Sequence, residues 1–274
     1  MGSPDSYDIH ALEVSPQLVL DTCKERVSCG SCGKSVKFFC YYCYKPVAGL
    51  EGRLPQIRLP FKLDVVKHPN ELDGKSTAVH AKIVAPQDVD VITFTDTCLD
   101  GVDVQTTALL FPGPDAQDVA EMDMTSIERV VVIDGTWSQA KAMMRNCPQL
   151  QRMQKVTIKP RRTRFWRFQN VDDQYLATIE AIYFLYRDSV GSNYNGEYDA
   201  LMYFYKYFYE YIQSEYASQP ERCFNHRHQK NYIEYDSAAP NPNVRLTKPD
   251  TVAKVNYNFD DLELGNMFGG ADPE

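Results

Sequence analysis

The sequence predicts an α/β protein with a parallel sheet and a small appended zinc module. The sheet is predicted because five short segments are apolar on both faces and helical periods lie between them. The zinc module is predicted because four cysteines between residues 29 and 43 have the spacing Cys-x2-Cys-x7-Cys-x2-Cys. A chain of 274 residues, 43% of them hydrophobic, is long enough for one main domain with a full core.

The cysteine run is the most specific local pattern. Each Cys-x-x-Cys turn directs two thiolates to one point, and two facing turns give the tetrahedral sulfur set that Zn²⁺ prefers. All four ligand positions are then filled, which leaves no place for a catalytic water and indicates a structural ion. The predicted ligands are Cys29, Cys32, Cys40 and Cys43. The scattered thiols Cys23, Cys98, Cys147 and Cys223 are expected to be ordinary cysteines.

The predicted sheet and helices alternate along the chain, as in a sheet with crossover connections. The expected strands are Leu63–Val66, Val91–Phe94, Ala108–Phe111, Val130–Ile133 and Val156–Ile158. The expected helices are Thr77–Val84, Ala116–Glu121, Trp137–Arg145, Tyr175–Arg187 and Ala200–Tyr216. The last two carry aromatic residues at helical spacing, which is more typical of core packing than of a cofactor site.

Around these elements we expect four regions. They are a flexible N-terminus (1–22), the zinc-ribbon module (23–50), the α/β domain (58–216) and a poorly ordered tail (217–274). The tail holds His226 and His228, which without a third ligand are weak evidence for a metal site. No segment reaches the roughly 18 to 20 apolar residues that span a membrane, so no membrane association is predicted.

Three loops with unusual content follow predicted strands, where ligands bind in open α/β sheets. In the first, His68 and Glu71 flank a turn at Pro69 and are candidate acid, base or phosphate contacts. Ser76 and Thr77, further along, are expected to cap the next helix. In the second, residues 112–114 (Pro-Gly-Pro) stop a strand and bring bare backbone to the surface.

The third loop lies within "VVVIDGTWSQAKAMM", residues 130–144. Gly135 permits a tight turn, Thr136 is a good N-cap, and a helix N-terminus favours the charge of Asp134. Capping does not explain Trp137, because an indole at a helix start needs something to pack on.

A basic segment stands out in a chain whose formal net charge is −8. "KVTIKPRRTRFWRFQN" has no acidic residue, and Phe165 and Trp166 lie among its cations. Cations can bind phosphates and aromatic rings can stack on bases, so this composition is expected of an RNA contact. The alternative is a basic loop that is only solvated. The cations of the segment are Lys155, Lys159, Arg161, Arg162, Arg164 and Arg167.

Taken in order, "HPNE…KST", "LLFPGP", "DGTW" and "RFWRFQNVDDQYLATIEAIYF" resemble the DTW-domain family of the TDD superfamily, most of all its eukaryotic type-1 branch. The likeness runs from about residue 29 to 215 and includes the cysteine knuckles. The resemblance implies a SPOUT-like fold with a C-terminal, trefoil-type knot. It also implies transfer of an aminocarboxypropyl group from S-adenosylmethionine (SAM) to N3 of a D-loop uridine in tRNA, with release of methylthioadenosine. One departure is Ala177, where the family usually has Ser.

The resemblance also implies roles for individual residues. Asp134 is the first candidate for the general base, or else it orients the donor, and Glu180 is the second candidate. The implied cofactor-binding residues are Leu110, Phe111, Pro112, Gly113, Asp134, Thr136, Trp137, Ala140, Thr178 and Glu180. The implied RNA-binding residues are His68, Glu71, Lys159, Arg161, Arg162, Arg164, Trp166 and Arg167.

Two other function classes stay open at this stage. One is a SPOUT-type, SAM-dependent RNA methyltransferase, and the other is a non-catalytic zinc-ribbon protein that binds RNA. The basic run "KPRRTR" is also typical of a nuclear signal, so a nuclear location is expected, with the cytoplasm as a second site. No obligate protein partner is predicted.

Overall fold

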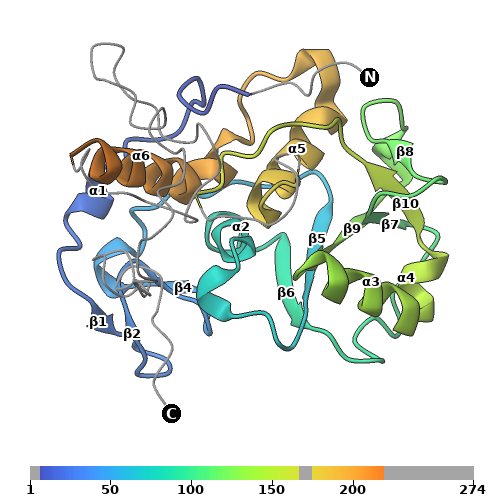
Figure 1. Cartoon of the computed structure of the whole chain (residues 1–274), viewed down its shortest axis with the longest axis horizontal. Coiled ribbons are helices and arrows are strands. Elements are labelled where there is room, and N and C mark those ends of the chain that lie inside the picture. Colours follow the sequence, from blue (N-terminus) through green and yellow to red (C-terminus); the bar gives the residue numbers. More distant parts are fainter. Residues whose placement is uncertain (1–6, 167–174, 219–274) are drawn as a thin grey trace, which may run out of the picture.

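The computed structural model describes residues 7–166 and 175–218 (Figure 1). Its centre is a parallel sheet with the strand order β6-β5-β9-β7-β10-β8. The strands are β5 (Lys62–Lys67), β6 (Val89–Thr93), β7 (Thr107–Leu110), β8 (Gln117–Asp118), β9 (Arg129–Asp134) and β10 (Gln154–Thr157). The predicted α/β class and the five predicted strands are confirmed, with ends that differ by one or two residues.

Helices cover both faces of the sheet because strand side chains alternate between two cores. Val65 and Val132 point into one core with α2, α5 and α6, whereas Val66 and Val131 point into the other with α3 and α4. The helices are α1 (Leu18–Asp21), α2 (Ala78–Val84), α3 (Trp137–Asn146), α4 (Pro148–Arg152), α5 (Thr178–Val190) and α6 (Tyr203–Ser218). The 3-10 turns are η1 (Ala48–Leu50), η2 (Asp73–Lys75), η3 (Met124–Ser126), η4 (Gly191–Asn193) and η5 (Asp199–Met202).

The helix predicted over Ala116–Glu121 is wrong. This segment instead contributes the two-residue strand β8, and the Val119 N–H donates to the carbonyl of Thr157 at 2.9 Å. The Asp118 carboxylate accepts from the Ala120 N–H at 2.9 Å, a local bond that competes with helix formation. Pairing with β10 therefore overrides a weak helical pattern.

The N-terminal residues 7–22 are not the flexible arm that we expected. The side chains of Tyr7, Ile9, Leu12 and Leu20 are buried in the core that contains α5 and α6. The Glu13 N–H also donates to the Asp199 carboxylate at 2.7 Å. Apolar side chains spaced along this arm supply the burial that an unattached terminus would lack.

The zinc module consists of two small antiparallel hairpins, one from β1 (Val27–Ser28) and β2 (Ser35–Val36), the other from β3 (Phe39–Cys40) and β4 (Lys45–Pro46). It is joined to the main core by Phe38, which packs on Phe208, and by Phe39, which packs on Phe204. His80 of α2 lies among these rings, and burial lowers its pKa to about 3, so it is neutral. The module therefore shares its core with the α/β domain.

Several expectations fall on residues 1–6, 167–174 and 219–274, outside the described part of the chain. They concern Arg167, Cys223, His226, His228 and the order of the tail. Within the described residues, no helix combines the length and the apolar character needed to cross a membrane.

Candidate active site

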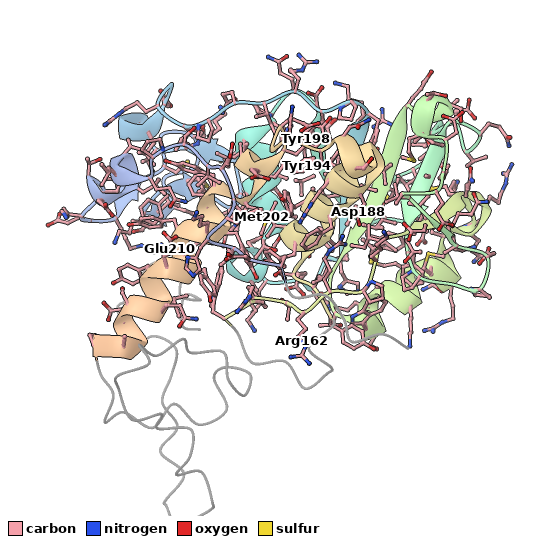
Figure 2. All side chains as sticks on the ribbon, turned by 90° about the horizontal axis from the view of Figure 1, so that it is seen from above. Arg162, Asp188, Tyr194, Tyr198, Met202 and Glu210 are labelled. Atoms are coloured by element: carbon pink, nitrogen blue, oxygen red, sulfur yellow. The ribbon has the colours of Figure 1, made fainter. Side chains whose placement is uncertain are left out.

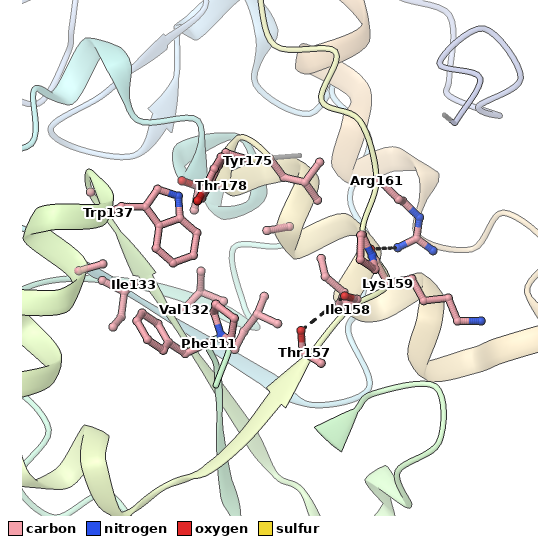
Figure 3. A pocket seen from close by; sticks show the side chains of 17 residues that line it. Phe111, Val132, Ile133, Trp137, Thr157, Ile158, Lys159, Arg161, Tyr175 and Thr178 are labelled. Atoms are coloured by element: carbon pink, nitrogen blue, oxygen red, sulfur yellow. Dashed lines mark hydrogen bonds between the residues drawn. The ribbon is translucent and has the colours of Figure 1, made fainter. Parts of the chain in front are cut away.

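A cavity of about 220 Å³ lies at the carboxyl ends of β7, β9 and β10 (Figure 3). This is the edge at which open α/β sheets bind ligands. Of the predicted cofactor-binding residues, Leu110, Phe111, Pro112, Trp137, Ala140 and Thr178 line it. The other lining residues are Val132, Ile133, Gly135, Thr157, Ile158, Lys159, Pro160, Arg161, Tyr175, Leu176 and Ala181. The structure thus brings the Pro-Gly loop, the Asp-Gly-Thr-Trp stretch and the start of α5 to one place.

Trp137 forms an aromatic wall of this cavity with two other rings. Its ring centroid lies 6.0 Å from that of Phe111 and 5.1 Å from that of Tyr175, which meets it edge to face. Its side chain remains 37% exposed, so one part of the indole packs while another stays open. The packing partners account for an indole at the first position of α3.

The backbone in front of Trp137 is fixed by a capping box. The Thr136 hydroxyl accepts from the Gln139 N–H at 3.3 Å, and the Gln139 side chain accepts from the Thr136 N–H at 2.7 Å. Gly135 leaves room for this box, since an added Cβ would lie 2.9 Å from the Gln139 side-chain oxygen and 3.2 Å from the Cβ of His68, and both neighbours would have to shift. The predicted N-cap at Thr136 is confirmed, although Thr136 does not line the cavity.

Asp134 ends β9 as a buried carboxylate held by two hydroxyl groups. Ser76 donates to Oδ2 and Thr178 donates to Oδ1, each at 2.6 Å. Burial raises the pKa of Asp134, while the two hydrogen bonds and the nearby Lys67 ammonium oppose that rise. Asp134 does not line the cavity itself, but Thr178 does. A single hydroxyl therefore connects this carboxylate to the cavity.

Ser76 and Thr77 do not cap their own helix, contrary to the prediction. Ser76 binds Asp134, and the Thr77 hydroxyl accepts from the N–H of Ile179 at 3.1 Å, at the start of α5. The N-cap residue of α5 is Ala177, which has no side-chain oxygen. Thr77 therefore supplies from another helix the acceptor that an N-cap serine would provide.

Glu180 lies in the first turn of α5 and is fully buried. Burial raises its pKa, and the four hydrogen bonds around its carboxylate oppose that rise. It accepts from the Tyr7 hydroxyl at 2.6 Å, the Thr163 hydroxyl at 2.5 Å, the Arg164 N–H at 2.8 Å and the Ala177 N–H at 2.7 Å. It does not line the cavity. Its bonds join the N-terminal arm, the basic segment and α5.

Only part of the basic segment is exposed to solvent. Arg161 is buried, where it forms a two-pronged ion pair with Asp188 at 2.7 and 2.8 Å and stacks on Phe184. Trp166 is also buried, against Tyr205 and Phe208. These two side chains are therefore built into the fold. Arg161 reaches the cavity wall, whereas the RNA contact predicted for Trp166 would require its ring to leave the core.

Other members of the segment do reach solvent. Lys159 and Arg162 are exposed, and Arg164 is half-buried. Figure 2 shows Arg162 projecting away from the ribbon, whereas Asp188 lies within the fold. The predicted RNA contact of Lys159, Arg162 and Arg164 agrees with this exposure and stays a prediction.

The His68 loop lies beside the Asp-Gly-Thr-Trp stretch rather than on the cavity wall. The His68 N–H donates to the Asp134 carbonyl at 2.9 Å, and its Nδ1 accepts from the Asn70 N–H at 3.0 Å. Glu71 donates its N–H to the His68 carbonyl at 3.0 Å, which closes the turn. Both side chains are half-buried and lie next to the site without lining it.

Sequence reasoning missed Lys67 and Tyr175 as parts of this site. Lys67 is paired in register with Asp134, is buried, and forms an ion pair with Asp73. A lysine at the end of an apolar strand was the available signal. Tyr175 was assigned to a helix, but α5 begins at Thr178, which leaves the ring free to join the aromatic wall.

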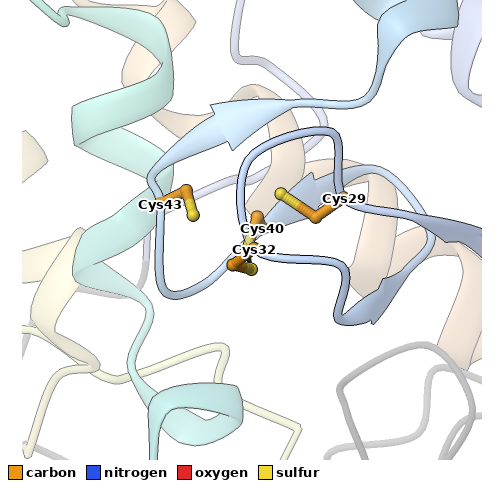
Figure 4. Close-up of side chains that lie close together, drawn as sticks. All are labelled: Cys29, Cys32, Cys40 and Cys43. Atoms are coloured by element: carbon orange, nitrogen blue, oxygen red, sulfur yellow. Dashed lines mark hydrogen bonds between the residues drawn. The ribbon is translucent and has the colours of Figure 1, made fainter.

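The four predicted zinc ligands form a cluster (Figure 4). The sulfur atoms of Cys29, Cys32, Cys40 and Cys43 all lie within 4.8 Å of one another, and those of Cys32 and Cys40 are 3.6 Å apart. A tetrahedron with Zn–S bonds of about 2.3 Å has edges of about 3.8 Å. Backbone hydrogen bonds from Cys32 and Ser31 lower the pKa of Cys29 to about 6, whereas burial raises the pKa of Cys40 and the hydrogen bond with Cys32 raises that of Cys43 to about 12. The cluster can therefore hold a metal ion.

Comparison of the sequence with known proteins finds one family and several similar proteins. The profile described as "DTW domain" matches residues 37–213. A protein of Xenopus tropicalis is 33% identical, covering 73% of this chain and 85% of its own length. A relative from Rattus norvegicus is 35% identical and covers 69% of this chain and 77% of its own length. One from Homo sapiens is 32% identical and covers 69% of this chain and 78% of its own length.

All three relatives are named tRNA-uridine aminocarboxypropyltransferase 1. No solved structure matches the chain. The profile covers more than half of the chain and the relatives cover more than two thirds of it. The chain belongs to the DTW domain family.

Proposed function

We propose that this protein transfers the 3-amino-3-carboxypropyl group of SAM to N3 of a D-loop uridine in tRNA and releases methylthioadenosine. The observation that carries the proposal is the cavity in which the Asp-Gly-Thr-Trp stretch meets the Pro-Gly loop and α5. The names of the relatives support the same activity. We further propose that the domain is SPOUT-like with a C-terminal, trefoil-type knot, on the resemblance alone.

The lining of the cavity fits the donor in chemical character. Aromatic faces such as those of Trp137, Phe111 and Tyr175 attract a flat purine and a sulfonium cation. About 220 Å³ is less than the 300 Å³ or more of sites that enclose a whole drug-sized ligand. We therefore assign only the adenine and sulfonium end to the cavity, and Thr178 and Lys159 are lining residues whose polar groups would bind the amino acid end.

The bound donor supplies an electrophilic γ-carbon next to its sulfonium. N3 of the uridine would form a bond to that carbon as the carbon–sulfur bond breaks, methylthioadenosine would leave with the electron pair of that bond, and the N3 proton would pass to water. Holding the two reacting atoms in line contributes much of the acceleration, because a misplacement of about 1 Å can lower the rate by about 100-fold. The chain contributes the rigid wall that sets this alignment.

We assign Asp134 an orienting role. Both of its oxygens accept bonds from hydroxyl groups, and it lies behind the cavity wall. It fixes Thr178 and the Gly135 turn in place, and a role as general base would have to pass through the Thr178 hydroxyl. The donors around Glu180 support a structural role for that carboxylate rather than proton transfer.

The remaining assignments complete the proposal. Zn²⁺ on the cysteine cluster is structural, because four thiolates leave no open coordination position. Lys159, Arg162 and Arg164 contact the tRNA backbone near the cavity, and His68 and Glu71 lie where a substrate could approach Gly135. We keep the nucleus as the proposed location, with the cytoplasm as a second site; of the basic run "KPRRTR", Lys159 and Arg162 are exposed and Arg161 is buried.

The decisive experiment incubates the full chain with SAM and unmodified tRNA. Digested nucleosides and the small-molecule by-product are then measured by mass spectrometry. Aminocarboxypropyluridine together with methylthioadenosine is expected. Adenosylhomocysteine with a methylated nucleoside would show a methyltransferase instead. Binding of tRNA with neither product would show an RNA-binding protein without this activity.

A further inference from the structure

A second concave surface lies on the zinc module, away from the active-site cavity. This groove has a volume of about 630 Å³ and shares no lining residue with the cavity. Four cations line it, Lys24, Lys37, Lys45 and Arg53. In Figure 1 the module lies at the opposite side of the molecule from α3 and α4. The groove is therefore too far from the reacting atoms to belong to the donor site.

The charge of this region is opposite to that of the whole chain. Residues 24–53 contain six basic and two acidic residues, a formal net charge of +4 that falls to +2 when four thiolates hold Zn²⁺, whereas the full chain has −8. The acidic residues are Glu25 and Glu51, and both line the groove. An isolated basic surface on an acidic protein indicates a polyanionic ligand, because local cations rather than total charge determine counterion release.

Three of the four cations of the groove have no ion-pair partner among the described residues. Lys24, Lys45 and Arg53 are exposed, and none of them forms an ion pair with another residue of the described chain. Arg53 donates to the Gly49 carbonyl at 3.2 Å, and Lys45 approaches the Ser31 hydroxyl at 3.4 Å, so both are oriented without being neutralised. By contrast, Lys62 and Lys155 of the α/β domain each pair with an aspartate.

We propose that this groove binds the sugar-phosphate backbone of tRNA at a site other than the modified uridine. The inference rests on the proposed function only in naming tRNA as the RNA. Lysine, arginine and hydroxyl side chains make most phosphate contacts, and the groove offers Thr22, Ser28 and Ser31 beside its cations. Anchoring the module through Phe38 and Phe39 to the main core keeps the two RNA contacts at a fixed separation.

The test compares the full-length protein with the triple variant Lys24→Ala, Lys45→Ala and Arg53→Ala. The Kd for unmodified tRNA is measured by fluorescence anisotropy over a range of salt concentrations, without SAM. We expect affinity to fall about tenfold near 0.1 M salt and the slope of log K against log salt to decrease by about 2 to 3, since each phosphate contact contributes about one. With SAM, KM for tRNA should rise while kcat stays unchanged.

Two matched controls use the same module. Lys34→Ala removes an exposed cation that lies outside the groove, over the Tyr42 ring, and should leave the salt slope unchanged. Glu25→Gln with Glu51→Gln removes negative charge from the groove and should strengthen binding. Zinc content measured by elemental analysis verifies that each variant keeps its fold.

An unchanged Kd and salt slope in the triple variant would overturn the proposal. So would an equal loss in Lys34→Ala, because charge anywhere on the module would then suffice. Competition by poly-glutamate as effective as that by RNA would show that the groove accepts an acidic peptide instead. These binding results do not depend on turnover, so they stay distinct from a failure to form aminocarboxypropyluridine.

Discussion

Two buried carboxylates, Asp134 at the end of β9 and Glu180 in the first turn of α5, differ in the groups that surround them. Asp134 accepts only from hydroxyl groups, one of which lines the cavity, whereas Glu180 accepts from two hydroxyls and two backbone N–H groups away from it. Hydroxyl groups can rotate and exchange partners, but backbone amides cannot. Burial raises the pKa of both carboxyls, so the identity of the donors, rather than burial, separates the candidate functional group from the structural one.

The largest expected effect is on stability at Glu180. Glu180→Ala leaves four donors without their acceptor, three of them buried and the Arg164 N–H partly buried, and each buried group costs about 1 to 3 kcal/mol, so we expect a loss of about 4 kcal/mol. In a chain of this size that lowers Tm by about 8 to 16 °C. Glu180→Gln keeps one acceptor oxygen and should lose less. Differential scanning calorimetry measures Tm for each variant. A Tm of Glu180→Ala within about a degree of the wild type would contradict the structural role of Glu180.

Asp134→Asn should affect activity more than stability. An amide in this position disturbs the bonds to Ser76 and Thr178 and thereby the cavity wall. If Asp134 orients the donor, KM for SAM should rise and kcat/KM should fall by about 10- to 100-fold, with the pH profile unchanged. Steady-state kinetics at several pH values measure this. Loss of the acidic limb of the profile, with KM unchanged, would instead assign Asp134 as the general base.

The two carboxyls also make a pH prediction. A carboxyl whose pKa is raised by folding binds its proton more tightly in the native state. Its contribution to stability is full below the ordinary carboxyl pKa of about 4 and is lost as pH rises through the native pKa. Urea unfolding of the wild type and Glu180→Gln at pH 5 and 8 should therefore give the larger stability difference at pH 5. A difference that grows with pH would show that the fold stabilises the charged form.

The smallest effect is expected at the cap of α5. Thr77→Val removes the acceptor for the Ile179 N–H and should lower the free energy of unfolding by about 1 kcal/mol. Thr77→Ser should retain that energy. Ala177→Ser in the Thr77→Val background should restore part of it, because a serine there supplies its own cap. If the second substitution restores nothing, Thr77 does not serve as the cap.

The features that could be predicted from the sequence are those that depend on residues close together in the chain. Apolar runs predicted the strands, Cys-x-x-Cys spacing predicted the sulfur cluster, and the order of residues 134–139 predicted the cap at Thr136. Several site residues could be named because the motifs that resemble the family fall on the cavity wall.

What could not be predicted depends on contacts between distant segments. A basic run shows its charge but not its direction, so the burial of Arg161 on Asp188 and of Trp166 on α6 was missed. The acceptor that caps α5 comes from a residue 102 positions earlier. The N-terminal arm completes the hydrogen bonds of Glu180 through Tyr7, which lies 173 positions earlier.

Those separations have a consequence for the order in which the molecule folds. Contacts between residues far apart in sequence form slowly, because a long loop must close before they contribute. During synthesis, Tyr7 and Thr77 leave the ribosome long before Glu180 and Ile179, so neither can reach its final partner until α5 has been made. The start of α5, and with it one wall of the cavity, should therefore be among the last parts to become ordered. Until then the sheet can form without a working site.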